Sequence, residues 1–386
     1  MKKGRLILGL VVLAALAGFG VWAWHRIHFD FAMFRAQLAQ ADWRMIAAAV
    51  GCIYLGYVFR SVRWALLLRH TRKIGPLTLV GTQVMGFTAV ALIGRLADPV
   101  RPYLVSKKTG LPLGSQIAVY IVERLLDAGA MALVFSIALL WVPADEILRV
   151  TAHSGWLAAL ARNHRMAAVL AARFGGLALT VLGAAFLVVV RLAGPAVASF
   201  FEHALRPLSK NLAQSMGHKV RSFHSGLDTM RSFGDFATAA LLSLCMWLLI
   251  ALAYFLATRA YVASPELASL TPPKCVLLMI ASGGASILQL PVLGWFSQIG
   301  LVAVALAALG ASPEAATACA ATLLLVTFLS IIPAGLIWAQ IEHVSLRRVT
   351  AESGHAGEAL AANEAGHSEI HGGVTEPIGK TAGEAQ

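Results

Sequence analysis

Residues 236–260 read FATAALLSLCMWLLIALAYFLATRA, an apolar run in which the first charged residue is Arg259. A helix rises 1.5 Å per residue, so 25 residues extend for about 38 Å. The hydrocarbon core of a bilayer is about 30 Å thick. This stretch therefore predicts a transmembrane helix.

The composition of the whole chain agrees with this prediction. Of its 386 residues, 58% are hydrophobic and only 13% are charged, and the mean hydropathy is +0.74. Soluble domains average about 45–50% apolar and about 25% charged residues. The composition excludes a secreted disulfide scaffold, a disordered chain and an ordinary cytosolic enzyme. We therefore expect an all-α integral membrane protein with several spans.

Five further stretches are apolar and long enough to span a membrane. They are residues 5–24, 45–68, 115–141, 170–192 and 315–341. The first resembles a signal peptide, but its apolar run continues to Trp24, so we interpret it as an anchor. All four cysteines, Cys52, Cys245, Cys275 and Cys319, lie in apolar stretches without a Cys-x-x-Cys spacing. We expect packed free thiols, with no metal and no cofactor.

Two more apolar segments, 76–94 and 275–310, contain glycine, proline and polar residues. Such residues disfavour a simple span. We expect each segment to form a re-entrant or broken hairpin, which gives six full spans. The alternative is that both are kinked spans, which gives eight. The residues expected at the tip of the second hairpin are Pro291, Gly294 and Gln298.

The positive-inside rule favours the hairpins. The formal net charge is +12, and the basic residues lie between apolar runs. Hairpins keep Arg95, Arg101, Lys107 and Lys108 on the side of Lys2, whereas a full crossing moves them outside. Both termini are then cytoplasmic. The two halves, 5–141 and 170–341, become inverted repeats, an arrangement typical of transporters.

Several ionisable residues fall in or beside the predicted spans. A charged residue at the centre of a span costs about 2.5–3.5 kcal/mol on insertion scales, so such residues have a partner or a function. Arg60 and Arg63 lie near the inner end of one span, where snorkelling to the surface is the alternative explanation. Glu123 and Asp127 are four residues apart and share a helix face, and Arg124 is placed to pair with Asp127.

Arg95, Asp98 and Arg101 form a third cluster in the first hairpin. All three clusters lie toward the cytoplasmic leaflet in the predicted topology. Because arginine suits bidentate binding of phosphate, we predict a site for a phospholipid or isoprenoid phosphate headgroup. An acidic metabolite fits this charge balance equally well. Charged groups that only hold the helices together remain an alternative for Glu123, Arg124 and Asp127.

Four motifs carry a resemblance to a known family. They are RSVRW at 60–64, GRLADPVRPYL at 94–104, GLP at 110–112 and ERLLD at 123–127. Over residues 5–345 the chain resembles the flippase-like membrane domain of lysylphosphatidylglycerol synthase (the multiple peptide resistance factor) and its stand-alone relatives. The resemblance implies translocation of a lipid or lipid-linked substrate.

Two departures from the family pattern affect the expected site. The family usually has Gly-Glu after the Gly-Arg of the loop, whereas this chain has Ala97 and Asp98. In the second hairpin, PVLGWFSQ at 291–298 carries Gln298 where the family has an acid. This change argues against proton coupling or recognition of an amine headgroup there. Only about 40 polar residues follow the last span, so we expect no soluble aminoacyl-transferase domain like that of the synthase.

We therefore expect residues 1–345 to form a flippase-like domain of the bacterial cytoplasmic membrane and 346–386 a disordered cytoplasmic tail. The alternatives are a membrane-embedded lipid-modifying enzyme and a partner subunit of a separate lipid synthase or glycosyltransferase. The chain has no recognised catalytic motif, so we expect no enzyme activity. Expected partners are a phospholipid or isoprenoid-linked lipid, a second copy of the chain or a separate synthase, and no nucleic acid.

Overall fold

The computed structural model is helical throughout the part of the chain that it describes, with no strand there. The described residues are 30–94, 97–151, 164–207, 233–285 and 293–345, with single residues or pairs between 209 and 220 and between 349 and 353. The predicted first span, residues 5–24, and nearly all of the predicted tail lie outside the described residues.

The elements follow one another as a series of helices of very different lengths. They are α2 (Phe31–Ala39), α3 (Trp43–Leu68), η1 (Pro76–Leu79), α4 (Val80–Ile93), α5 (Val100–Thr109), α6 (Leu113–Leu140), α7 (Ala144–Thr151), α9 (Arg165–Leu205), α11 (Phe233–Arg259), α12 (Pro265–Ala268), α13 (Pro272–Ala285), α14 (Leu293–Ala308), α15 (Pro313–Leu324), the π-helical turn η4 (Leu325–Leu329) and α16 (Ile331–Ile341).

Five helical stretches in the described part are long and apolar enough to cross a membrane. They are Trp43–Leu68, Pro76–Ile93, Arg165–Ala185, Gly234–Arg259 and Pro313–Ile341. Helix α6 is also long, at 28 residues, but it carries Glu123, Arg124 and Asp127. The chain is therefore a multi-pass integral membrane protein.

The first broken segment differs in detail from the sequence prediction. Gly81, Gln83 and Gly86 do not interrupt the helix, because α4 runs through all three. The chain turns at Gly94 instead, where φ is 87° and glycine is favoured because it has no Cβ. Helix α5 follows and packs against α4. In the second broken segment, α13 and α14 likewise pack against each other.

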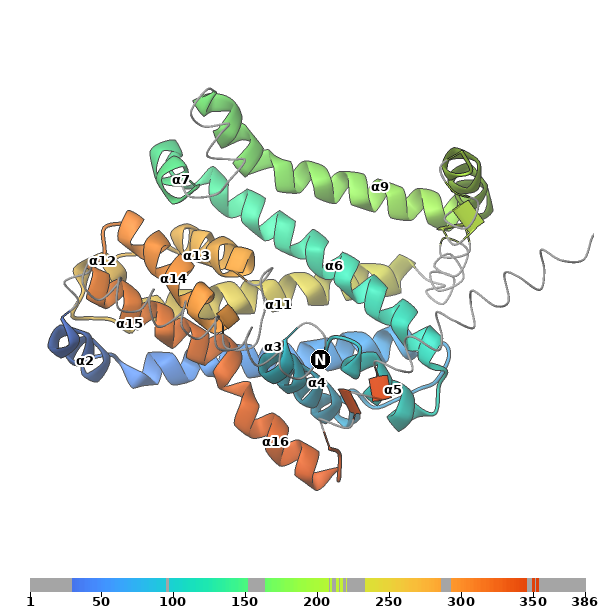
Figure 1. Ribbon diagram of the computed structural model, residues 1–386, viewed down its shortest axis with the longest axis horizontal. Coiled ribbons are helices and arrows are strands. Elements are labelled where there is room, and N and C mark those ends of the chain that lie inside the picture. The colour runs from blue at the N-terminus through green and yellow to red at the C-terminus, as the bar shows by residue number, and fades with distance from the viewer. Residues whose placement is uncertain are drawn as a thin grey trace, which may run out of the picture.

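Helices α3 and α11 form the centre of the molecule and lie side by side along most of their length (Figure 1). Helix α4 packs against α16 on one flank, and α13 packs against α6 on the other. Helix α9 covers the outer side of α6. The 170–192 span is part of this longer helix, which kinks at Ala193, just before Pro195. The core of the protein is therefore built from elements of both predicted halves.

The last long stretch bends where its regular hydrogen bonding changes. The π-helical turn η4 interrupts the regular α-helical pattern, and Pro333 has no N–H to donate to the carbonyl of Leu329. Tyr54 donates its hydroxyl to the carbonyl of Ser330 at 2.8 Å, and Thr88 donates to the carbonyl of Ile331 at 3.2 Å. Side chains of the first half thus bind main-chain carbonyls of the second.

Candidate functional site

Six of the predicted site residues meet at one place, where α3, α5 and α6 converge. They are Arg60, Arg63, Arg101, Glu123, Arg124 and Asp127. We call these six residues the arginine cluster. Three members, Arg63, Arg101 and Glu123, are each only 1% exposed. Most of the cluster therefore lies inside the protein.

Glu123 is the centre of the arginine cluster. Its Oε1 atom lies 2.6 Å from Nη2 of Arg63, 3.6 Å from Nη1 of Arg60 and 3.5 Å from Nη2 of Arg124. Its Oε2 atom accepts a hydrogen bond from Nη2 of Arg101. Both oxygens of this carboxylate are therefore occupied by guanidinium groups.

Asp127 lies one helical turn further along α6 and binds three of the same arginines. Its Oδ1 atom is 2.5 Å from Nη1 of Arg63, and its Oδ2 atom is 3.3 Å from both Arg60 and Arg124. The predicted pairing of Arg124 with Asp127 is confirmed. Arg63 also donates to the hydroxyl of Ser243, which brings α11 into the network. Because Arg63 is buried and paired inside the protein, its side chain does not extend to the membrane surface.

Aromatic rings surround the arginines and were not predicted from the sequence. The guanidinium carbon of Arg101 lies 4.5 Å from the ring centre of Phe87, and that of Arg60 lies 4.7 Å from the same ring. Tyr120 lies under Arg101 at 5.4 Å and under Arg124 at 5.2 Å. Ring faces attract cations, most strongly where water is excluded. The rings therefore help to hold positive charge in the interior.

A glycine in α4 makes room for Arg101. A Cβ atom on Gly86 would overlap with Cγ of Arg101. The arginine stem therefore crosses α4 where a side chain is missing. Its Nε then donates to Oε1 of Gln83 at 3.1 Å. Gly86 and Gln83 interrupt the apolar pattern of 76–94, and both contact Arg101. This interruption is the feature of the sequence that indicates the contact.

The charges of the arginine cluster do not balance. Four guanidinium groups face the two carboxylates of Glu123 and Asp127, so two positive charges remain. Asp98 is half-buried in the turn before α5, close enough to Arg124 to act on its charge. Arg124 is the most accessible member, with 40% of its side chain exposed. The site is therefore cationic on balance and open on the side of Arg124.

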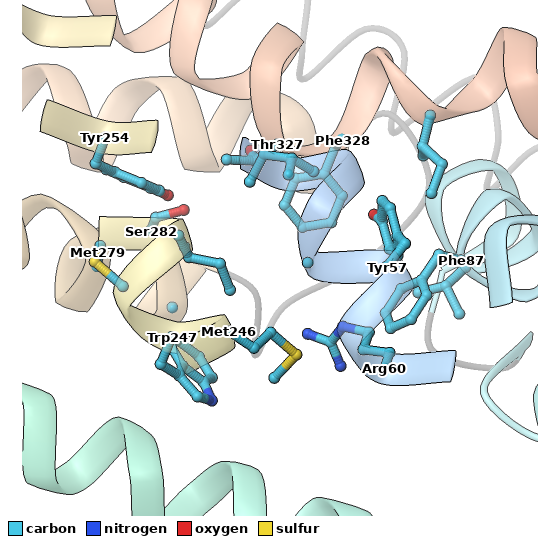
Figure 2. A pocket seen from close by; sticks show the side chains of 16 residues that line it. Tyr57, Arg60, Phe87, Met246, Trp247, Tyr254, Met279, Ser282, Thr327 and Phe328 are labelled. Atoms are coloured by element: carbon cyan, nitrogen blue, oxygen red, sulfur yellow. The ribbon is translucent and has the colours of Figure 1, made fainter. Parts of the chain in front are cut away.

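A cavity of about 220 Å³ adjoins the arginine cluster between the two halves of the fold. Figure 2 shows Arg60 on one wall and Met246 and Trp247 of α11 opposite it. Its walls come from α3, α4, α11, α13, η4 and α16, and they are mostly apolar. Arg60 contributes to both the cavity and the cluster, so the two form one site. No single segment of sequence predicts such a cavity.

The remaining predicted residues do not join this site. Arg95 and Pro291 lie outside the described residues. Gly294 and Gln298 are buried on α14, and neither is among the residues that line the cavity. Within the described ranges, no group of three or more histidine, cysteine or acidic side chains is placed to hold a metal ion.

Comparison with known proteins identifies the family. Residues 6–335 match the family described as the lysylphosphatidylglycerol synthase TM region, which is most of the chain. Searches of curated proteins and of solved structures gave no match. The match covers the arginine cluster, the cavity and both broken segments, and its extent shows that the chain belongs to the lysylphosphatidylglycerol synthase transmembrane-region family.

Proposed function

We propose that the protein moves a lipid or lipid-linked substrate between the leaflets of the bacterial cytoplasmic membrane. The observation that carries this proposal is Arg60, which belongs both to a buried cationic cluster and to an apolar cavity between the two halves. A lipid presents a charged headgroup joined to apolar chains. A site that offers both kinds of surface within membrane-crossing helices suits such a molecule.

The proposed inverted repeat supports transport. Helix α3 pairs with α11, while α4 contacts α16 and α13 contacts α6. This pattern is expected if 5–141 and 170–341 are related by a two-fold axis through the α3–α11 contact. Gly110 after α5 and Gly310 after α14 also match, since both have positive φ, 69° and 102°. Transporters built this way carry their substrate sites between the repeats, near the bilayer midplane.

We assign the headgroup to the arginine cluster. Arg60 and Arg124 are its more accessible cations, with 11% and 40% of their side chains exposed, so they are the ones proposed to reach a phosphate. Arg63 and Arg101 are fully enclosed and are proposed to position the two carboxylates. The proposed topology, with both termini cytoplasmic, places this cluster toward the inner leaflet.

Transport is proposed in preference to catalysis. A lipid-modifying enzyme would need Glu123 or Asp127 as a free base. All four oxygens of these carboxylates contact guanidinium groups, so both carboxylates are already engaged in ion pairs. A partner subunit of a separate synthase is the other alternative, and it predicts no lipid movement by the purified protein alone.

The test is lipid movement in proteoliposomes. Acyl-chain-labelled fluorescent phosphatidylglycerol is distributed over both leaflets, and dithionite added outside reduces the label that becomes accessible. We expect the wild type to expose inner-leaflet lipid, Arg124→Ala to do so much more slowly, and Arg149→Ala to match the wild type. Arg149 is a suitable control because it lies on α7, away from the arginine cluster, and pairs with Asp145 one turn earlier at 2.8 Å. A wild type that matches empty liposomes contradicts the proposal, and a newly formed lipid in extracts indicates an enzyme instead.

A further inference from the structure

We infer that the site selects a lipid whose headgroup is anionic and carries no amine, so that an unmodified phosphate headgroup is accepted and an aminoacylated one is rejected. This inference rests on the proposed function, because it names the substrate class of the same site. It depends on which side chains face the cavity, and on which charged atoms are already engaged.

Neither carboxylate of the arginine cluster is available for an amine. Both oxygens of Glu123 and both oxygens of Asp127 already contact arginine side chains. No aspartate or glutamate is among the described residues that line the cavity. An ammonium group in the cavity would lie near the guanidinium of Arg60. The ammonium group itself would have no carboxylate on the cavity wall to pair with. Repulsion between like charges is strong where water is excluded.

One polar group on the cavity wall can only donate. Trp247 lines the cavity, and its Nε1 atom is buried without a hydrogen-bond partner in the described part of the chain. An indole nitrogen can only donate, so an acceptor such as a phosphate oxygen would satisfy it. In Figure 2 the side chain of Met246 lies between Trp247 and Arg60. The cavity therefore offers a hydrogen-bond donor and a positive charge at two separate places on its wall.

The charge count points to the same class of headgroup. The arginine cluster has two more positive than negative charges, and half-buried Asp98 lies near Arg124. One or two negative charges would therefore neutralise the site, which fits a phosphodiester or a phosphomonoester. Bidentate contacts between arginine and phosphate are among the stronger hydrogen bonds in proteins.

The apolar walls indicate that a lipid, rather than a free phosphate, is the ligand. Ile53, Ile250, Met279, Phe328 and Ile331 all line the cavity. At about 220 Å³ the cavity is smaller than the ~300–1,000 Å³ of typical small-molecule sites. It would hold the headgroup end of an amphiphile, whose chains continue among the helices.

The test compares two lipids that differ by one lysyl group. Wild-type protein in phosphatidylcholine vesicles is given acyl-labelled phosphatidylglycerol or acyl-labelled lysylphosphatidylglycerol, and dithionite accessibility is followed. We expect phosphatidylglycerol to cross at least about tenfold faster, a difference of about 1.4 kcal/mol in barrier. In Arg60→Glu this preference should disappear or reverse, whereas Arg149→Ala should keep it.

A binding measurement separates the two proposals. Quenching of tryptophan fluorescence in detergent is titrated with phosphatidylglycerol, lysylphosphatidylglycerol and water-soluble glycerol phosphate. If neither lipid crosses but phosphatidylglycerol binds at least about tenfold more tightly than its lysyl form, transport fails and the selectivity stands. Equal or faster crossing of lysylphosphatidylglycerol overturns the selectivity and leaves transport intact. Glycerol phosphate that binds as tightly as phosphatidylglycerol overturns the assignment to a lipid.

Discussion

Replacing Glu123 with glutamine should destabilise the fold more than any other single-atom change in the arginine cluster. Glutamine keeps the size of the side chain but removes the charge that holds Arg63 at 2.6 Å and also accepts from Arg101. Breaking a buried ion pair by neutralising one partner costs about 3–5 kcal/mol, because the other charge stays buried and unpaired. Glu123 is 1% exposed, so solvent screening does not reduce this value.

The assay is reversible unfolding in mixed micelles, followed by circular dichroism. The matched control is Glu146→Gln, whose partner Lys274 lies 2.7 Å away in a more accessible pair, with side chains 19% and 29% exposed. We expect about 3–5 kcal/mol for Glu123→Gln and about 0–1 kcal/mol for the control. In an Arg101→Met background the cost at Glu123 should fall by about 0.5–3 kcal/mol. Equal costs for the two glutamate variants would refute the reasoning.

Two further predictions concern packing. Gly86→Ala should displace Arg101 and cost about 1–3 kcal/mol, because the new methyl group occupies the path of the arginine stem. In contrast, Gly51→Ala meets nothing within 4 Å and should gain up to about 1 kcal/mol from helix propensity, as thermal unfolding in detergent would reveal. Cys275 and Cys319 are buried, so both should resist a maleimide until the protein is unfolded, as mass spectrometry of the labelled peptides would show.

The transmembrane helices could be predicted because their signal is local. A long apolar run specifies a span whatever it packs against, and α11 begins and ends within three residues of the stretch 236–260. The break between α4 and α5 was harder to place. Gly81 and Gly86 suggest a break in the helix when the sequence is considered alone. In the structure they allow close packing, Gly81 against Trp338 and Gly86 against Arg101.

The arginine cluster was predictable only in part. The spacing of Glu123 and Asp127 puts both on one face of α6, and the cost of charge in a membrane shows that they need partners. The sequence does not reveal that Arg63 of α3 is the partner of both, because that contact depends on how two distant helices pack. The rings of Phe87 and Tyr120 are ordinary apolar residues in the sequence.

The central claim, that a lipid passes through the cavity between the halves, is tested most directly by filling that cavity. Gly283 lines it, and a Cβ atom there would meet nothing within 4 Å, so a phenylalanine ring can enter without disturbing the arginine cluster. We expect Gly283→Phe to lower dithionite-accessible lipid exchange to the level of empty vesicles, while Gly51→Phe, on the exposed side of α3, keeps the wild-type rate. A folded Gly283→Phe protein that moves lipid as fast as the wild type would contradict the account.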